Sequence, residues 1–245
     1  MSKHYFSKLI EKEISNLTNS VPSTIANSEL TAEKLAAYID HTNLKPDAQR
    51  DDIIALCEEA KKFQFAAVCV NPSWVSLCAE QLEGSPVLIC AVTGFPLGAT
   101  TSDAKAIETE ELIELGANEI DMVLNVGRLK DEDYTYVFED IQQVVTAAEG
   151  APVKVILETC LLSDNEIIAG SVLSKEAGAH MVKTSTGFSK AGATIEQVSL
   201  MRRVVGPEMG VKAAGGIRTK RQALAMIKAG ASRIGASASV AIISE

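Results

Sequence analysis

The sequence predicts a (β/α)8 barrel, the TIM-barrel fold, with one additional helix in front of it. Three observations favour this fold: a length of 245 residues, eight apolar strand-like runs, and helical segments that alternate with them. A barrel of this kind needs about 250 residues, and runs that start about 20 to 35 residues apart suit repeated β-α units rather than hairpins. The alternative, a doubly wound open sheet, is disfavoured because the chain has no G-x-G-x-x-G turn and no P-loop pattern.

The eight predicted strands are apolar runs bounded by turn residues or by the starts of helices. They follow one another without a break in composition, so a single barrel domain over residues 31–245 is predicted. The predicted strands are residues 37–42, 66–71, 87–95, 119–126, 153–159, 180–186, 210–216 and 233–237.

Three of the intervening helices have clear boundaries in the sequence. Segments 102–116, 163–178 and 219–230 each begin at a serine or threonine that can cap a helix and end at a glycine. Glu166 follows Ser163 by three residues, which is the spacing of a capping box. These segments therefore predict helices on the outside of the barrel.

The N-terminal part, residues 1–30, is predicted to be an amphipathic helix followed by a polar linker at residues 18–29. We expect this helix to pack on the domain or on a partner, where it would cover either the bottom of the barrel or a dimer interface. The apolar face of the helix consists of Phe6, Leu9, Ile10, Ile14 and Leu17.

Composition and charge exclude several classes of protein. The net charge of −9 argues against nucleic-acid binding, which usually needs a basic face. No apolar run approaches the roughly 18 residues that span a bilayer, and the N-terminus lacks the apolar core of a secretory signal, so a cytoplasmic protein is predicted. The three histidines lack metal-ligand spacing, and the five cysteines include no C-x-x-C pair, so core thiols and no metal site are predicted.

A (β/α)8 barrel places its chemistry at the C-terminal ends of its strands. Every predicted strand carries a polar residue that interrupts its apolar run, and the set as a whole suggests an enzyme. In chain order these residues are Asp40, Asn71, Thr93, Asp121, Glu158, Lys183, Lys212 and Ser237.

Two lysines, Lys183 in "VKTSTGF" and Lys212 in "VKAAGG", interrupt neighbouring strands at similar positions. A single lysine would more often reach solvent or neutralise a carboxylate. Because neighbouring strands lie about 4.8 Å apart, two inward ammonium groups would repel each other. A cation lowers the pKa of a neighbouring lysine, and the free amine that results can form a Schiff base with a carbonyl. This predicts a catalytic lysine pair, with Asp121 as its acid/base partner.

A glycine-rich set follows the last three strands: Gly187, Gly215, Gly216 and, with a hydroxyl, Ser237. Any one of these glycines alone would only make a tight turn. Together they predict a phosphorylated substrate, because loops after strands seven and eight of such barrels often hold phosphate and glycine exposes backbone N–H groups.

Eight motifs, in register with the eight strands, resemble those of the deoxyribose-phosphate aldolase family. The resemblance runs from about Thr31 to Ser237, and no motif is decisive by itself. The motifs are "IDHTNLKPDA" (39–48), "VCVNP" (68–72), "VTGFPLG" (92–98), "EIDMVLNVG" (119–127), "KVILET" (154–159), "VKTSTGF" (182–188), "VKAAGGIRT" (211–219) and "IGAS" (234–237).

The resemblance implies a class I aldolase without a cofactor, acting in deoxyribose phosphate catabolism. Such an enzyme reversibly cleaves 2-deoxy-D-ribose 5-phosphate to acetaldehyde and D-glyceraldehyde 3-phosphate. It implies that Lys183 forms the Schiff base, that Lys212 perturbs Lys183 or shuttles protons, and that Asp121 donates and accepts protons. Asp40 and Cys69 match residues that line the site.

The resemblance also implies that the glycines and the serine described above bind phosphate. Two differences from some family members stand out. Ala238 stands where they have a second serine, and no aromatic residue follows Phe188, whereas some members carry a tyrosine in a C-terminal tail.

Two other functions remain open from the residues. A phosphosugar isomerase or lyase would use the lysines only electrostatically, and a silent phospho-ligand-binding or assembly protein would bind without turnover. The aldolase is preferred over both, because Lys183, Lys212 and Asp121 are all present. The expected partners are small phosphorylated sugars and aldehydes, with neither nucleic acid nor membrane, and a homodimer is expected.

Overall fold

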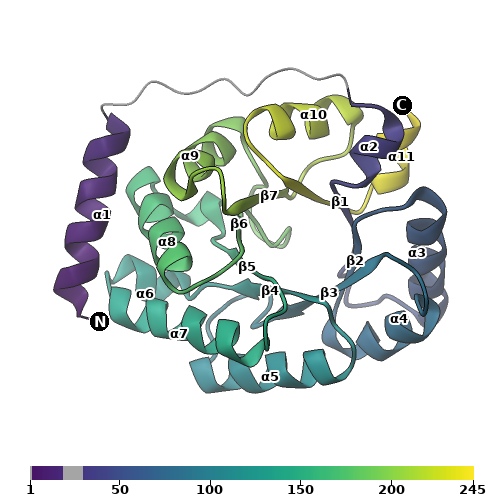
Figure 1. The fold of residues 1–245 in the computed structure, drawn as a ribbon, viewed down its shortest axis with the longest axis horizontal. Helices are drawn as coiled ribbons and strands as arrows, with labels where there is room; N and C mark the ends of the chain where they lie inside the picture. The colour runs from purple at the N-terminus through teal and green to yellow at the C-terminus, as the bar shows by residue number, and fades with distance from the viewer. Residues whose placement is uncertain (1, 19–29) are drawn as a thin grey trace.

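Eight parallel strands close into a barrel in chain order, with β8 paired to β1 (Figure 1). The structure, a computed structural model, describes residues 2–18 and 30–245. The (β/α)8 fold and all eight predicted strands are confirmed. The strands are β1 (Ile39–Asn43), β2 (Ala67–Val70), β3 (Leu88–Thr93), β4 (Glu119–Val123), β5 (Val153–Ile156), β6 (Met181–Lys183), β7 (Gly210–Ala214) and β8 (Arg233–Ala236).

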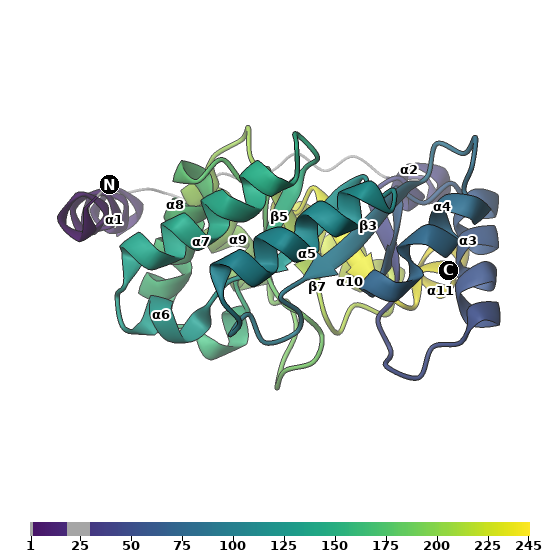
Figure 2. The ribbon, with the colours of Figure 1, turned by 90° about the horizontal axis from the view of Figure 1, so that it is seen from below.

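Helices surround the barrel, and one of them, α1, lies outside this ring (Figures 1 and 2). Two short 3-10 turns, η1 (Pro72–Trp74) and η2 (Thr159–Leu161), follow β2 and β5. The helices of the described residues are α1 (Lys3–Thr18), α2 (Ala32–Ala36), α3 (Arg50–Phe63), α4 (Val75–Gln81), α5 (Ser102–Glu114), α6 (Val126–Lys130), α7 (Tyr134–Ala147), α8 (Asp164–Glu176), α9 (Ile195–Val205), α10 (Lys220–Lys228) and α11 (Ser239–Ser244).

Capping residues fix where the helices begin. The predicted capping box of α8 is confirmed: Ser163 and Glu166 each accept a hydrogen bond from the backbone N–H of the other. The Thr219 cap of α10 is confirmed as well. The predicted cap of α5 was wrong by one residue, since the side chain of Thr101, not of Ser102, accepts the capping hydrogen bond. Both positions carry a hydroxyl, so residue type alone does not distinguish them.

The interior of the barrel is not a continuous apolar core. Side chains alternate along each strand, so those facing the helices build the main hydrophobic core, while their neighbours face the barrel interior. A small apolar cluster of this interior lies beside β2 and β3. It consists of Leu44, Ala67, Cys69, Cys90 and Val92. Charged side chains from the other strands fill the space beside it, and they form the site described below.

The helix α1 packs on the side of the barrel, against α7, α8 and α9 (Figures 1 and 2). Phe6 is fully buried, and its ring centroid lies 4.9 Å from that of Phe138 on α7. The predicted amphipathic helix is thus present, but it does not cover the bottom of the barrel, because its apolar face meets the outer helical layer. The predicted linker, residues 18–29, lies outside the described residues except for the last residue of α1. No described helix is long and apolar enough to cross a membrane.

Phe6→Ala is expected to lower the free energy of unfolding by about 3 to 4 kcal/mol, because it removes a fully buried ring between two helices. Equilibrium unfolding in urea measures this loss. Lys12→Ala, on an exposed position of the same helix, is the control and should change stability by less than about 0.5 kcal/mol. A Phe6→Ala variant as stable as this control would show that α1 does not pack on the barrel in solution.

Candidate active site

A cavity of about 540 Å³ opens at the end of the barrel where the loops after β1, β6, β7 and β8 meet. This volume is typical of small-molecule sites. The cavity lies where a (β/α)8 barrel places its chemistry, at the C-terminal ends of the strands. Lys183 and four of the predicted phosphate-binding residues line it, namely Gly187, Gly215, Gly216 and Ser237.

Lys183 and Lys212 occupy paired positions on β6 and β7, so the predicted equal height of the two lysines is confirmed. The Nζ atoms of both lie 2.7 Å from the same oxygen, Oδ2 of Asp121 on β4. Lys212 and Asp121 are fully buried, whereas Lys183 lines the cavity. The structure therefore brings all three predicted catalytic residues together, and only Lys183 reaches the space that a substrate can occupy.

The charged cluster extends further than the sequence analysis predicted. Nζ of Lys154 on β5 lies 3.0 Å from Asp121 Oδ1 and 2.7 Å from Glu119 Oε2. The guanidinium of Arg233 on β8 pairs with Glu119 at 3.1 Å and with Asp40 at 2.6 Å. A continuous chain of ion pairs thus runs inside the barrel below the cavity.

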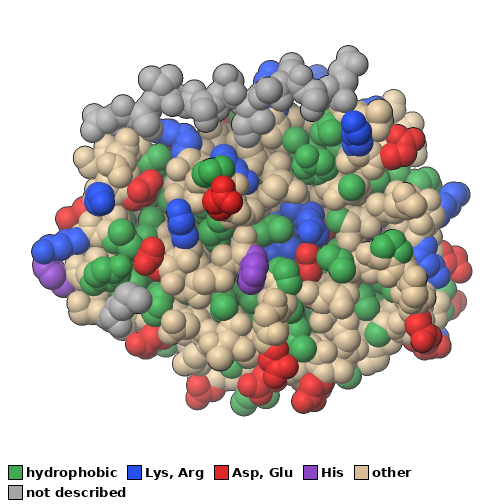
Figure 3. All heavy atoms as spheres, viewed as in Figure 1, with side chains coloured by type: hydrophobic (Ala, Val, Ile, Leu, Met, Phe, Trp, Pro, Cys, Tyr) green, Lys and Arg blue, Asp and Glu red, His purple; other side chains and the backbone are tan. Residues whose placement is uncertain are grey.

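Lys212 closes this chain, since its Nζ lies 2.5 Å from Asp40 Oδ2 as well as next to Asp121. Figure 3 shows one face of the molecule, with basic and acidic side chains close together at its centre. Arg233 is the most exposed residue of these ion pairs, with 13% of its side chain exposed.

Lys154 could have been found from the sequence. It interrupts the apolar run "VKVILET" just as Lys183 and Lys212 interrupt theirs, whereas the polar residue predicted for that strand is Glu158. In the structure the Glu158 carboxylate instead accepts hydrogen bonds from the backbone N–H and the hydroxyl of Thr186. Glu158 therefore shapes the loop after β6.

Contacts fix the charges in the cluster. Burial raises the pKa of Asp121, but the ammonium groups of Lys154, Lys183 and Lys212 outweigh burial and hold this pKa well below its ordinary value. Burial lowers the pKa of Lys212, but Asp121 and Asp40 outweigh burial, so this pKa lies well above its ordinary value. The pKa of Lys154 is raised for the same kind of reason, chiefly by Asp121 acting against burial. At neutral pH Asp121 is therefore a carboxylate, and Lys154 and Lys212 beside it are ammonium groups.

The predicted phosphate-binding residues form one wall of the cavity. Gly187, Gly215 and Gly216 have positive φ values of 88°, 85° and 77°, which glycine adopts without strain. A Cβ atom added at Gly187 or Gly216 would meet nothing within 4 Å. The backbone N–H groups of Gly187, Gly216 and Ser237 have no hydrogen-bond partner among the described residues, and Arg218 is exposed on the same wall. This wall can therefore receive an anion.

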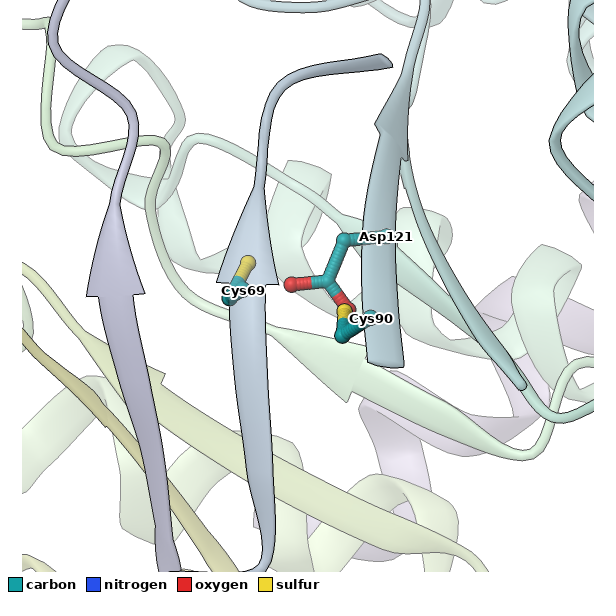
Figure 4. Close-up of side chains that lie close together, drawn as sticks. All are labelled: Cys69, Cys90 and Asp121. Atoms are coloured by element: carbon teal, nitrogen blue, oxygen red, sulfur yellow. The ribbon is translucent and has the colours of Figure 1, made fainter. Parts of the chain in front are cut away.

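Asp40 and Cys69, which were expected to line the substrate site, are fully buried and are not among the residues that line the cavity. Asp40 holds Lys212 from below. Cys69, Cys90 and Asp121 lie close together on β2, β3 and β4, with one ligand atom of each within 4.8 Å of the others (Figure 4). These residues support the floor of the cavity.

Two groups of side chains have donor atoms spaced for a metal ion. The first is Cys69, Cys90 and Asp121, and the second combines Cys90 with Asp40 and Glu119. All three carboxylates already accept hydrogen bonds or ion pairs from buried ammonium or guanidinium groups. A metal cation would have to displace those positive charges, so we assign the carboxylates to the lysines and the arginine.

A comparison with known families decides what kind of protein carries this site. The model for the "DeoC/LacD family aldolase" matches residues 34–243. The chain belongs to the DeoC/LacD aldolase family. It is therefore an enzyme of the aldolase class, and the family disfavours both alternatives, the phosphosugar isomerase and the silent binding protein.

Individual family members are similar over most of the chain. The deoxyribose-phosphate aldolases of Streptococcus sanguinis and Clostridium novyi are each 59% identical over 210 residues, which cover 86% and 85% of this chain and 96% and 95% of theirs. The structure of a candidate deoxyribose-phosphate aldolase from Coccidioides immitis matches with a TM-score of 0.96 and 43% identity, over 100% of this chain and 97% of that one. The deoxyribose phosphate aldolase of Aeropyrum pernix matches with a TM-score of 0.83 and 34% identity, over 87% and 91%.

Proposed function

We propose that the chain is a class I deoxyribose-phosphate aldolase that reversibly cleaves 2-deoxy-D-ribose 5-phosphate to acetaldehyde and D-glyceraldehyde 3-phosphate. The observation that carries this proposal is the position of Lys183. It is the member of the charged cluster whose amine reaches the cavity, and Asp121 and Lys212 lie directly behind it. The names and identities of the bacterial relatives support the substrate.

The reaction follows from an amine facing a carbonyl. The free amine of Lys183 attacks the aldehyde carbon C1, and loss of water gives an iminium ion. The iminium withdraws the electrons of the C2–C3 bond while the C3 hydroxyl loses its proton, so this bond breaks. D-glyceraldehyde 3-phosphate leaves, and an enamine remains on the lysine. Protonation at C2 and hydrolysis then release acetaldehyde and restore the amine.

The proton transfers need a donor and a carrier beside Lys183. The ammonium groups of Lys154 and Lys212 hold Asp121 as a carboxylate, so Asp121 does not store a proton but can pass one between Lys212 and Lys183. Lys212 stays protonated and lies within hydrogen-bond distance of Asp121. We assign proton storage to Lys212 and transfer to Asp121, which refines the donor and acceptor role expected for Asp121.

Borohydride reduction in the presence of acetaldehyde, followed by peptide mass mapping, tests the proposed nucleophile. A reduced two-carbon adduct on Lys183 is the expected result. An adduct on Lys212 would reverse the roles of the two lysines. Folded protein without an adduct on either lysine would exclude the Schiff-base mechanism.

Gly216→Ala is expected to raise the KM for the phosphorylated substrate about 10-fold or more, because its methyl group would enter the open space where backbone N–H groups meet phosphate. Cleavage of unphosphorylated 2-deoxyribose should change little. Gly84→Ala is a matched control, since Gly84 has φ 72°, equally open surroundings and a position away from the cavity. Equal effects of Gly216→Ala on both substrates would rule out the phosphate site.

We further propose that the enzyme acts in deoxyribose phosphate catabolism as a cytoplasmic homodimer. The free thiols of all five cysteines suit a reducing compartment. Sedimentation velocity measures the oligomeric state directly.

A further inference from the structure

The buried cluster contains equal numbers of acidic and basic side chains apart from Lys183. The acids are Asp40, Glu119 and Asp121, and the bases are Lys154, Lys212 and Arg233. Each acid contacts at least two of these bases, and none of the six side chains lines the cavity. With Lys183 as a free amine the cluster is neutral, whereas with Lys183 as an ammonium it carries one uncompensated buried positive charge. An uncompensated charge is costly inside a protein.

We propose that Lys154, Glu119 and Arg233 are positioning residues that balance the charge of the cluster so that Lys183 holds its amine in the reactive, unprotonated form. The inference rests on the proposed function for what this amine does. Lys154 acts through Asp121, to which Lys183 is bound, and Glu119 and Arg233 act through Lys154 and Asp40. None of the three touches the cavity, so their effect on a substrate must be transmitted by charge.

Other titratable groups lie near Lys183 but are not among the six side chains of the charge count. Two thiols face the cluster, and burial raises the pKa of Cys90 well above its ordinary value. A hydrogen bond with Cys90 lowers the pKa of Cys69, to which Lys212 and Lys183 also contribute. The charged groups on the cavity walls are exposed and screened by solvent. They are Lys45, Asp52, Glu59, which pairs with His41, and Arg218.

The test measures the rate at which acetic anhydride acylates Lys183 between about pH 5 and pH 10, quantified by peptide mass spectrometry. Glu119→Gln removes a negative charge, so the pH midpoint of acylation should fall by about one unit. Lys154→Met removes a positive charge and keeps a side chain of similar length, so the pH midpoint should rise by about one unit. The double variant, Glu119→Gln with Lys154→Met, restores the balance and should return the midpoint close to that of the wild type.

A purely structural role would give a different pattern, namely lost stability without midpoint shifts of opposite sign. Lys105→Met is the matched control: Lys105 is equally buried and pairs with Asp140 at 2.6 Å, but it lies on helix α5 outside the barrel. It should destabilise the protein without moving the midpoint. If Lys154→Met does not fold, Arg233→Met replaces it in the test, because Arg233 is partly open to solvent. Arg233→Met also removes a positive charge, so it should shift the midpoint upward.

Shifts in the same direction for Glu119→Gln and Lys154→Met, or unshifted midpoints in folded variants, would overturn the inference. A downward shift in Cys69→Ala would also overturn it, because the thiol would then belong to the charge count. Acylation needs no substrate, so its outcome is independent of turnover. The proposed function fails instead if acetaldehyde and borohydride leave wild-type Lys183 unmodified.

Discussion

Lys183→Ala is expected to reduce kcat/KM for 2-deoxy-D-ribose 5-phosphate by at least about 10,000-fold, because no other amine of the cluster reaches the cavity. The fold should remain intact. Removing Lys183 leaves three carboxylates facing three cations, and Asp121 keeps Lys154 and Lys212 as partners. Steady-state kinetics measures the loss, and circular dichroism during thermal unfolding measures the fold.

Lys190→Ala provides the control for this prediction, since Lys190 is an exposed lysine in the loop that follows Lys183. Its kcat/KM should stay within about two-fold of the wild type. If folded Lys183→Ala protein kept more than about one hundredth of the activity, Lys183 would not be the nucleophile.

Lys212→Leu is expected to move the pH optimum upward by about one to two units and to reduce activity at neutral pH by at least about 100-fold. Lys212 contributes a positive charge bound to both Asp40 and Asp121. Without this charge the two carboxylates favour the ammonium form of Lys183, so a higher pH is needed to release its proton. The pH dependence of kcat/KM measures the shift directly.

The same substitution should lower the free energy of unfolding by about 3 kcal/mol, because two buried carboxylates lose a partner. Lys212→Arg separates charge from proton transfer, since guanidinium keeps the positive charge but does not release a proton. Its pH optimum should stay near that of the wild type while its rate falls. An unchanged pH profile in Lys212→Leu would contradict the electrostatic account of the lysine pair.

The sequence by itself determined the order and type of the barrel elements. Apolar runs of strand length alternate with capped helical segments, and both signals are local, so they can be read without knowing which strands are neighbours. The pairing of Lys183 with Lys212 followed from the closed barrel, because consecutive strands are adjacent and both lysines occupy the same place in their strands. The motifs then pointed to the aldolase family, which the comparisons confirmed.

Only the tertiary structure decided which charges meet inside the barrel. Arg233 and Asp40 are nearly two hundred residues apart in the chain, and they meet because β8 closes on β1. Spacing along the chain does not specify how far each side chain reaches across the interior, so Asp40 and Cys69 were expected at the cavity and lie beneath it. The packing of α1 depends likewise on the outer surface of α7 to α9, which exists only once the barrel has formed. The burial of these groups, and with it the balance of charge around Lys183, is a property of the closed barrel.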